Sequence, residues 1–128
     1  MRCISITILF LFFINTTFGS ACLKDSSGKQ ESCNEVFLEG NVSEIMKIQQ
    51  KGKCNEMIPG NKRVKTCPLT ELSSKCVYKT TYCEDFSDKN SCKSFKSIKY
   101  FYNNANTLYS EKTLKSNCDL LKGKYQKL

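Results

Sequence analysis

The stretch Cys76-Val77-Tyr78-Lys79-Thr80-Thr81-Tyr82-Cys83 decides the fold class, because its pattern is compatible with two kinds of secondary structure. Its β-branched and aromatic side chains favour a strand. Apolar residues in and around it nevertheless recur at helical spacing, and the proline after Cys67 suits the first turn of a helix. The proline is Pro68, and the residues at helical spacing are Leu69, Leu72, Cys76, Cys83 and Phe86. We expect a helix here, with a strand as the alternative.

Three further segments carry helix signals. Residues 41–52 begin with Asn41 as a possible cap and Glu44 three residues later, and they end at Gly52. In residues 91–102, apolar side chains recur every three or four positions opposite a row of lysines at 93, 96 and 99. Residues 110–122 begin with Ser110 as a possible cap and are followed by Gly123.

The sequence therefore predicts a small disulfide-rich, mainly α domain of about four short helices and four disulfides. Residues 22–34 are expected to form an irregular arm, and residues 53–66 a polar, basic loop. The alternative is a β-rich, disulfide-stapled domain. One version of it starts from Ser97-Ile98-Lys99, Leu108-Tyr109 and residues 121–125. Together these segments are similar to a fragment of a βγ-crystallin Greek key, which would make them successive strands.

The cysteines indicate an oxidising compartment. Nine occur in 128 residues, and Cys3 lies within residues 1–21, whose apolar run Ile4–Ile14 is typical of a cleaved secretory signal. That run is too short to span a membrane, so no transmembrane anchor is expected. Cleavage could follow Gly19 or Ala21. The eight remaining cysteines can all form disulfides in one domain, residues 22–128, with the pairing left open. They are Cys22, Cys33, Cys54, Cys67, Cys76, Cys83, Cys92 and Cys118.

The composition excludes several chemistries. The chain has no histidine, which rules out Ser-His and Cys-His nucleophile systems, and the cysteines lack the close spacing of zinc ligands. Glu84, Asp85 and Asp88 could in principle serve a carboxylate-dependent hydrolase or bind calcium. Adjacent acids in a polar turn are more often a solvated surface loop. We expect no enzymatic activity, no metal and no cofactor.

The formal net charge of +8 favours acidic partners. Lys62, Arg63 and Lys65 form a cluster of the kind that binds sulfated polysaccharide, and Asn41 begins an N-glycosylation sequon. These features predict a secreted, monomeric, non-enzymatic effector, of a toxin-like, immune-modulatory or signalling type. It would bind an extracellular protein or channel, with a sulfated glycan as a further possible partner and nucleic acid excluded by secretion. The alternative function is an extracellular carrier of a small apolar ligand.

Overall fold

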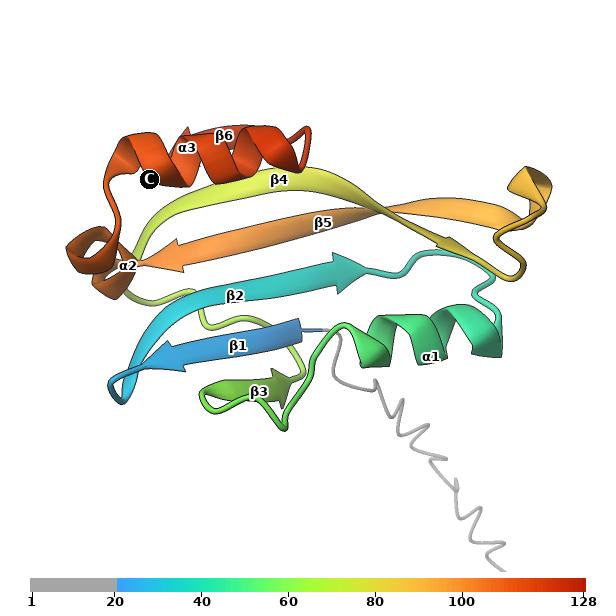
Figure 1. Ribbon diagram of the computed structural model, residues 1–128, viewed down its shortest axis with the longest axis horizontal. Coiled ribbons are helices and arrows are strands. Elements are labelled where there is room, and N and C mark those ends of the chain that lie inside the picture. The colour runs from blue at the N-terminus through green and yellow to red at the C-terminus, as the bar shows by residue number, and fades with distance from the viewer. Residues whose placement is uncertain (1–20) are drawn as a thin grey trace, which may run out of the picture.

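A single antiparallel sheet forms the body of the molecule (Figure 1). The computed structural model describes residues 21–128, so the predicted signal segment, apart from Ala21, lies outside the described residues. Six strands run in the order β3-β1-β2-β5-β4-β6. Their bounds are β1 Ala21–Ser26, β2 Lys29–Phe37, β3 Asn61–Val64, β4 Leu72–Cys83, β5 Cys92–Tyr102 and β6 Lys124–Lys127.

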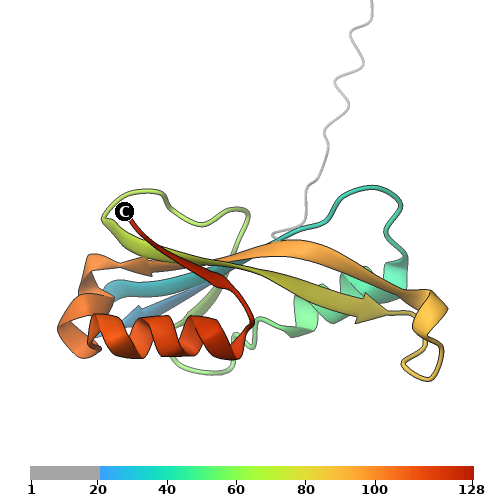
Figure 2. The same ribbon diagram turned by 90° about the horizontal axis from the view of Figure 1, so that it is seen from above.

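The helices are short and lie on one side of this sheet. They are α1 Glu44–Gly52, α2 Asn103–Leu108 and α3 Glu111–Leu120, with a 3₁₀ turn at Lys89–Ser91. Figure 2 shows α1 and α3 on the same side of the sheet, and the segment joining β3 to β4 on the opposite side. No helix within residues 21–128 is long and apolar enough to cross a membrane.

Both faces of the sheet carry a hydrophobic core. Beneath α3, Phe101 and Leu114 are buried against the Cys76–Cys118 disulfide, and beneath α1, Met46 packs with Tyr82 and Phe95. On the opposite face the buried cluster includes Ile98, Tyr100 and Tyr102, together with Cys33 and Cys67. The hydroxyl of Tyr102 donates to the carbonyl oxygen of Pro68 at 2.8 Å. The β3–β4 segment is thereby fixed over this face.

The prediction of a mainly α domain is wrong, and the β-rich alternative is correct. Residues 72–83 and 92–102 form the two longest strands, β4 and β5, where helices were expected. Strand β5 is central and its second half, residues 97–102, is covered on both faces, so the apolar residues there do not follow the alternation that marks a strand with one solvated face. The apparent helical period of 91–102 arose from this two-sided burial.

The other expectations for secondary structure had mixed outcomes. Helices within 41–52 and 110–122 are confirmed as α1 and α3, although the Ser43 hydroxyl, not Asn41, caps α1 by accepting from the Met46 amide at 3.2 Å. The irregular arm is wrong, because residues 21–37 form the β1–β2 hairpin. The predicted loop 53–66 contains β3. In the crystallin-like pattern, Leu108 is the last residue of a helix, so its segments are not successive strands.

Four disulfides join the elements and include all eight cysteines outside the predicted signal segment. The pairs are Cys22–Cys54, Cys33–Cys67, Cys76–Cys118 and Cys83–Cys92. The first links β1 to the chain just after α1, the second β2 to the β3–β4 segment, and the third β4 to α3. At Gly123 a Cβ atom would lie 2.5 Å from the Cys76 sulfur, so only glycine lets the chain turn closely around the third disulfide.

Candidate binding groove between the helices

A groove of about 730 Å³ lies on the helix-bearing face of the sheet. Strands β2, β5 and β4 supply its floor, with Asn34, Lys99 and Tyr78 among the lining residues. Gln50 of α1 and Leu114 of α3 stand on its two sides. The groove is therefore a strip of sheet surface that the two helices flank and do not cover.

The strand register explains why the strip stays open. Pairing places Cys22 beside Asn34, Asn34 beside Lys99 and Lys99 beside Cys76, so these four residues form one row across β1, β2, β5 and β4. Residues opposite one another in a sheet project from the same face. The cysteines at the two ends of the row are bonded to Cys54 and Cys118. The disulfides therefore hold the helical segments at the ends of the row, and Asn34 and Lys99 remain between them.

Two lysines and one carboxylate dominate the electrostatics of this floor. The Lys24 ammonium lies 3.5 Å from Glu31, whose side chain is 8% exposed. Burial lowers the pKa of Lys99 and the nearby Lys24 charge lowers it further, whereas Glu31 raises it. The Lys99 ammonium also lies 5.6 Å from the centre of the Phe101 ring. Because two cations share one carboxylate, an additional anion would be stabilised beside them.

Hydroxyl groups line the part of the groove nearer α1. Thr80 and Ser97 are hydrogen-bonded at 2.6 Å, and the Tyr78 hydroxyl donates to Asn34 Oδ1 at 3.3 Å. The Tyr82 side chain is 1% exposed, and its hydroxyl has no hydrogen-bond partner among the described residues. Burial, and secondarily Tyr78, raises the pKa of Tyr82 to about 12. Both phenols are therefore protonated at neutral pH and can donate hydrogen bonds.

The predicted polyanion residues Lys62, Arg63 and Lys65 do not share a loop. Lys62 and Arg63 are neighbours in β3, so their side chains lie on opposite faces of the sheet. Arg63 lines the groove, donates to the Lys51 carbonyl at 2.8 Å and lies 3.8 Å from Glu56. Lys65 follows the strand. Polyanion binding by the three residues stays a prediction, and the geometry brings only Arg63 to the groove.

Sequence reasoning did not select Lys24 or Lys99 as site residues. Lys99 was grouped with Lys93 and Lys96 as a helix face, but in β5 the alternation separates Lys96 from the other two. Lys93 donates to the Glu39 carbonyl at 3.0 Å and so supports a loop. If residues 92–102 had been assigned to a strand, the alternation of side chains would have placed Lys99 on the face of the sheet that carries the groove.

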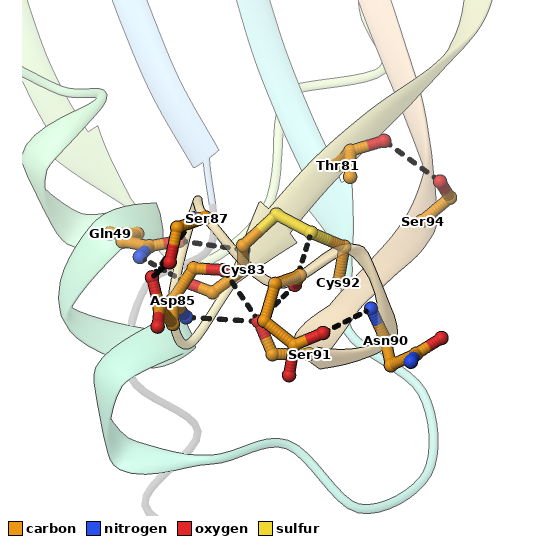
Figure 3. Close-up of a disulfide and its surroundings, with 10 residues drawn as sticks. Gln49, Thr81, Cys83, Asp85, Ser87, Asn90, Ser91, Cys92 and Ser94 are labelled. Atoms are coloured by element: carbon orange, nitrogen blue, oxygen red, sulfur yellow. Dashed lines mark hydrogen bonds between the residues drawn. A yellow bond between two sulfur atoms is a disulfide. The ribbon is translucent and has the colours of Figure 1, made fainter.

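The remaining predicted positions lie outside the groove. Asn41 is exposed before α1, as a glycosylation acceptor must be. The loop that closes the β4–β5 hairpin holds Glu84, Asp85 and Asp88. Figure 3 shows Asp85 in this loop. There Asp85 Oδ1 accepts from Ser87, and Asp88 Oδ1 accepts from the Asn90 amide. Within residues 21–128, no group of three or more His, Cys, Asp or Glu side chains is arranged to hold a metal ion.

Comparison with known proteins gives no relationship from which a function could be transferred. No protein-family model, no curated protein and no solved structure matches the chain.

Proposed function

We propose that this protein is a secreted, non-enzymatic effector that binds an acidic extracellular partner in the groove between α1 and α3. The observation that carries the proposal is the pair Lys24 and Lys99 on the groove floor, where Glu31 is the one acidic residue among the described lining residues and forms its ion pair with Lys24. An anionic group from a ligand would complete this arrangement by pairing with the second ammonium group.

Secretion is part of the proposal and has two supports. Four disulfides in a domain of this size are compatible with an extracellular protein. The apolar run at residues 4–14 is typical of a secretory signal. The strong positive charge would also draw acidic partners to the surface before they reach the groove.

The same groove makes an apolar ligand a poor candidate. A carrier for such a ligand would need a mostly apolar lining, whereas this floor includes two ammonium groups, a carboxylate and several hydroxyls. An apolar ligand would displace the water that hydrates these groups without offering them a hydrogen-bond partner, and this desolvation costs free energy. We therefore expect an apolar fluorescent probe not to bind in the groove.

The test compares two double variants with the same change in charge. Lys24→Gln/Lys99→Gln alters the groove, and Lys89→Gln/Lys112→Gln alters two exposed positions elsewhere. Binding to heparin and to polyglutamate is measured over a range of salt concentrations. The groove variant is expected to lose most of the affinity for at least one of the two polyanions, and the control variant only a little. Equal losses would show that net charge alone matters and would contradict the proposal.

A further inference from the structure

The outer edge of β4 is only partly paired. Strand β6 pairs with β4 from Ser74 to Val77, whereas β5 pairs with it on the other side as far as Cys83. No strand within residues 21–128 lies beside the outer edge of residues 78–83. These residues read Tyr-Lys-Thr-Thr-Tyr-Cys and are strong strand formers. An open edge of this composition can accept another strand.

A glutamine side chain marks one end of the open edge. The side-chain amide of Gln49, in α1, donates to the Cys83 carbonyl at 2.6 Å, and its oxygen accepts from the Cys83 amide at 3.2 Å (Figure 3). These are the two bonds that a residue of a paired strand would make. Gln49 thus takes the place of a neighbouring strand at Cys83.

The direction of the backbone groups follows from this contact. Cys83 directs its amide and carbonyl away from β5, and residues two apart on a strand direct theirs to the same side. The β4–β5 register has no irregularity between Ser74 and Cys83. Lys79 and Thr81, which lie between the end of β6 pairing and Gln49, therefore present two amides and two carbonyls to the open edge.

The open edge faces the groove. Lys79, Thr80 and Thr81 are among the residues that line the hollow, and so is Tyr82 with its unpartnered hydroxyl. A strand added at this edge would enter the hollow between α1 and β6. It would satisfy the backbone of Lys79 and Thr81 and bring a polar backbone close to Tyr82.

The lysines around the open edge of β4 favour an added strand with acidic side chains. Lys79 lies opposite Lys96, and Lys124 lies opposite Val77, so the three lysines lie around the open edge on one face of the sheet, the face that does not carry Lys99. Acidic side chains on an added strand would lie among them. A second copy of this chain pairing symmetrically at the same edge would instead bring two Lys79 side chains together, which is unfavourable.

We propose that an extended acidic segment of a partner protein adds as a strand to β4 at Lys79 and Thr81, between β6 and Gln49. This deepens the proposed function, because it names an acidic peptide as the partner and an edge of the same groove as its docking place. Backbone hydrogen bonds would supply affinity, and the lysines would supply selectivity for acidic segments.

The experiment uses hydrogen exchange on the full mature protein with a short peptide of alternating Glu and Val as the probe. In the free protein the Lys79 and Thr81 amides should exchange about a hundredfold faster than those of Tyr78 and Thr80, which are bonded to β5. Saturating peptide should slow Lys79 and Thr81 by about tenfold or more and leave the other two unchanged. Slow exchange at Lys79 and Thr81 in the free protein would overturn the proposal.

Two variants at one position separate the backbone from the side chain. Thr81→Pro and Thr81→Val both lose the Thr81–Ser94 hydroxyl bond of 2.8 Å, but only the proline removes the outward amide. Peptide binding should survive Thr81→Val and fall by about tenfold or more in Thr81→Pro. If the proline variant does not fold, the exchange pattern of the unaltered protein still decides. A peptide of alternating Lys and Val is the charge control.

The outcomes distinguish this inference from the proposed function. Heparin or polyglutamate binding that depends on Lys24 and Lys99, without protection of Lys79 and Thr81 by the peptide, would leave the anion-binding groove standing and exclude strand addition. Loss of both would contradict both. A concentration-dependent dimer that disappears in Thr81→Pro would show that the edge pairs with a second copy, which would also overturn the inference.

Discussion

Two buried tyrosines differ in how the fold satisfies their hydroxyls. Tyr102 donates to the Pro68 carbonyl at 2.8 Å, whereas Tyr82 has no partner for its hydroxyl among the described residues. Removing a buried hydroxyl costs a hydrogen bond only where one is made. We expect Tyr102→Phe to lower the free energy of unfolding by about 1 kcal/mol or more, and Tyr82→Phe to change it little. Urea denaturation of the two variants checks this, and a larger loss for Tyr82→Phe would contradict it.

The same two residues predict how stability depends on alkaline pH. Burial is the main reason that the pKa values of Tyr82 and Tyr102 are raised to about 12 from an ordinary value of 10.0. The fold thus favours the neutral phenol, and the unfolded chain ionises first. The stability contribution is complete below pH 10 and is lost as the pH rises from about 10 to about 12.

Absorbance of the phenolate after a rapid pH jump tests this dependence. The native protein should show a late ionisation phase near pH 12, and the phase should be missing in Tyr82→Phe/Tyr102→Phe. The double variant should also lose less stability than the parent protein between pH 10 and pH 12. Ionisation of all tyrosines near pH 10 in the native protein would contradict the burial argument.

Local signals in the sequence identified α1 and α3 but not α2, and the pattern of apolar residues misidentified the strands. Ser110 caps α3 as predicted, because a cap depends on residues only a few positions away. Strand β5 is defined by pairing with β2 and β4 at its two edges, and by the distant segments that cover its faces, α3 on one side and the β3–β4 segment on the other. Its apolar residues therefore lie on both faces, and their spacing resembles that of a helix. Secondary structure that depends on distant partners was thus the part that the sequence did not reveal.

The candidate groove could not be predicted from the sequence either, because it also depends on pairing between distant strands. It depends on the row that sets Asn34 and Lys99 between Cys22 and Cys76, and the row exists only once four strands are in register. The even number of cysteines predicted that all eight would pair, but no spacing could indicate which cysteines flank the groove. The predicted cluster at Lys62, Arg63 and Lys65 relied on sequence proximity, which a strand converts into opposite faces.

The start of β1 favours one of the two cleavage sites of the predicted signal segment. Ala21 is 3% exposed and pairs with Glu35 on one side and Val64 on the other. A cut after Ala21 would delete the first residue of the strand and its packing, whereas a cut after Gly19 would leave both intact. We expect the processed protein to begin at Ser20. N-terminal sequencing checks this, and a sequence that starts at Cys22 would contradict it.

At the scale of the whole molecule, the disulfides connect segments that the sheet alone would hold weakly. Cys76–Cys118 closes a loop with a sequence separation of 42 and joins α3 to β4, whereas Cys83–Cys92 has a separation of 9 and closes a hairpin whose strands are already paired. In the chain-entropy model the longer loop restricts the unfolded chain more. The larger loss on removal should therefore come from Cys76–Cys118.

Replacing each of these pairs by alanine tests that order. We expect Cys76→Ala/Cys118→Ala to lower the free energy of unfolding by about 1 kcal/mol more than Cys83→Ala/Cys92→Ala, from loop length alone. Loss of packing beneath α3 should widen the difference, because Cys76 and Cys118 are both fully buried against Leu114. Chemical denaturation of the two variants gives the comparison, with the amide signals of α3 as a local readout. If α3 kept its protection from exchange without its disulfide, packing alone would hold that wall of the groove, and the role given to Cys76–Cys118 would have to be withdrawn.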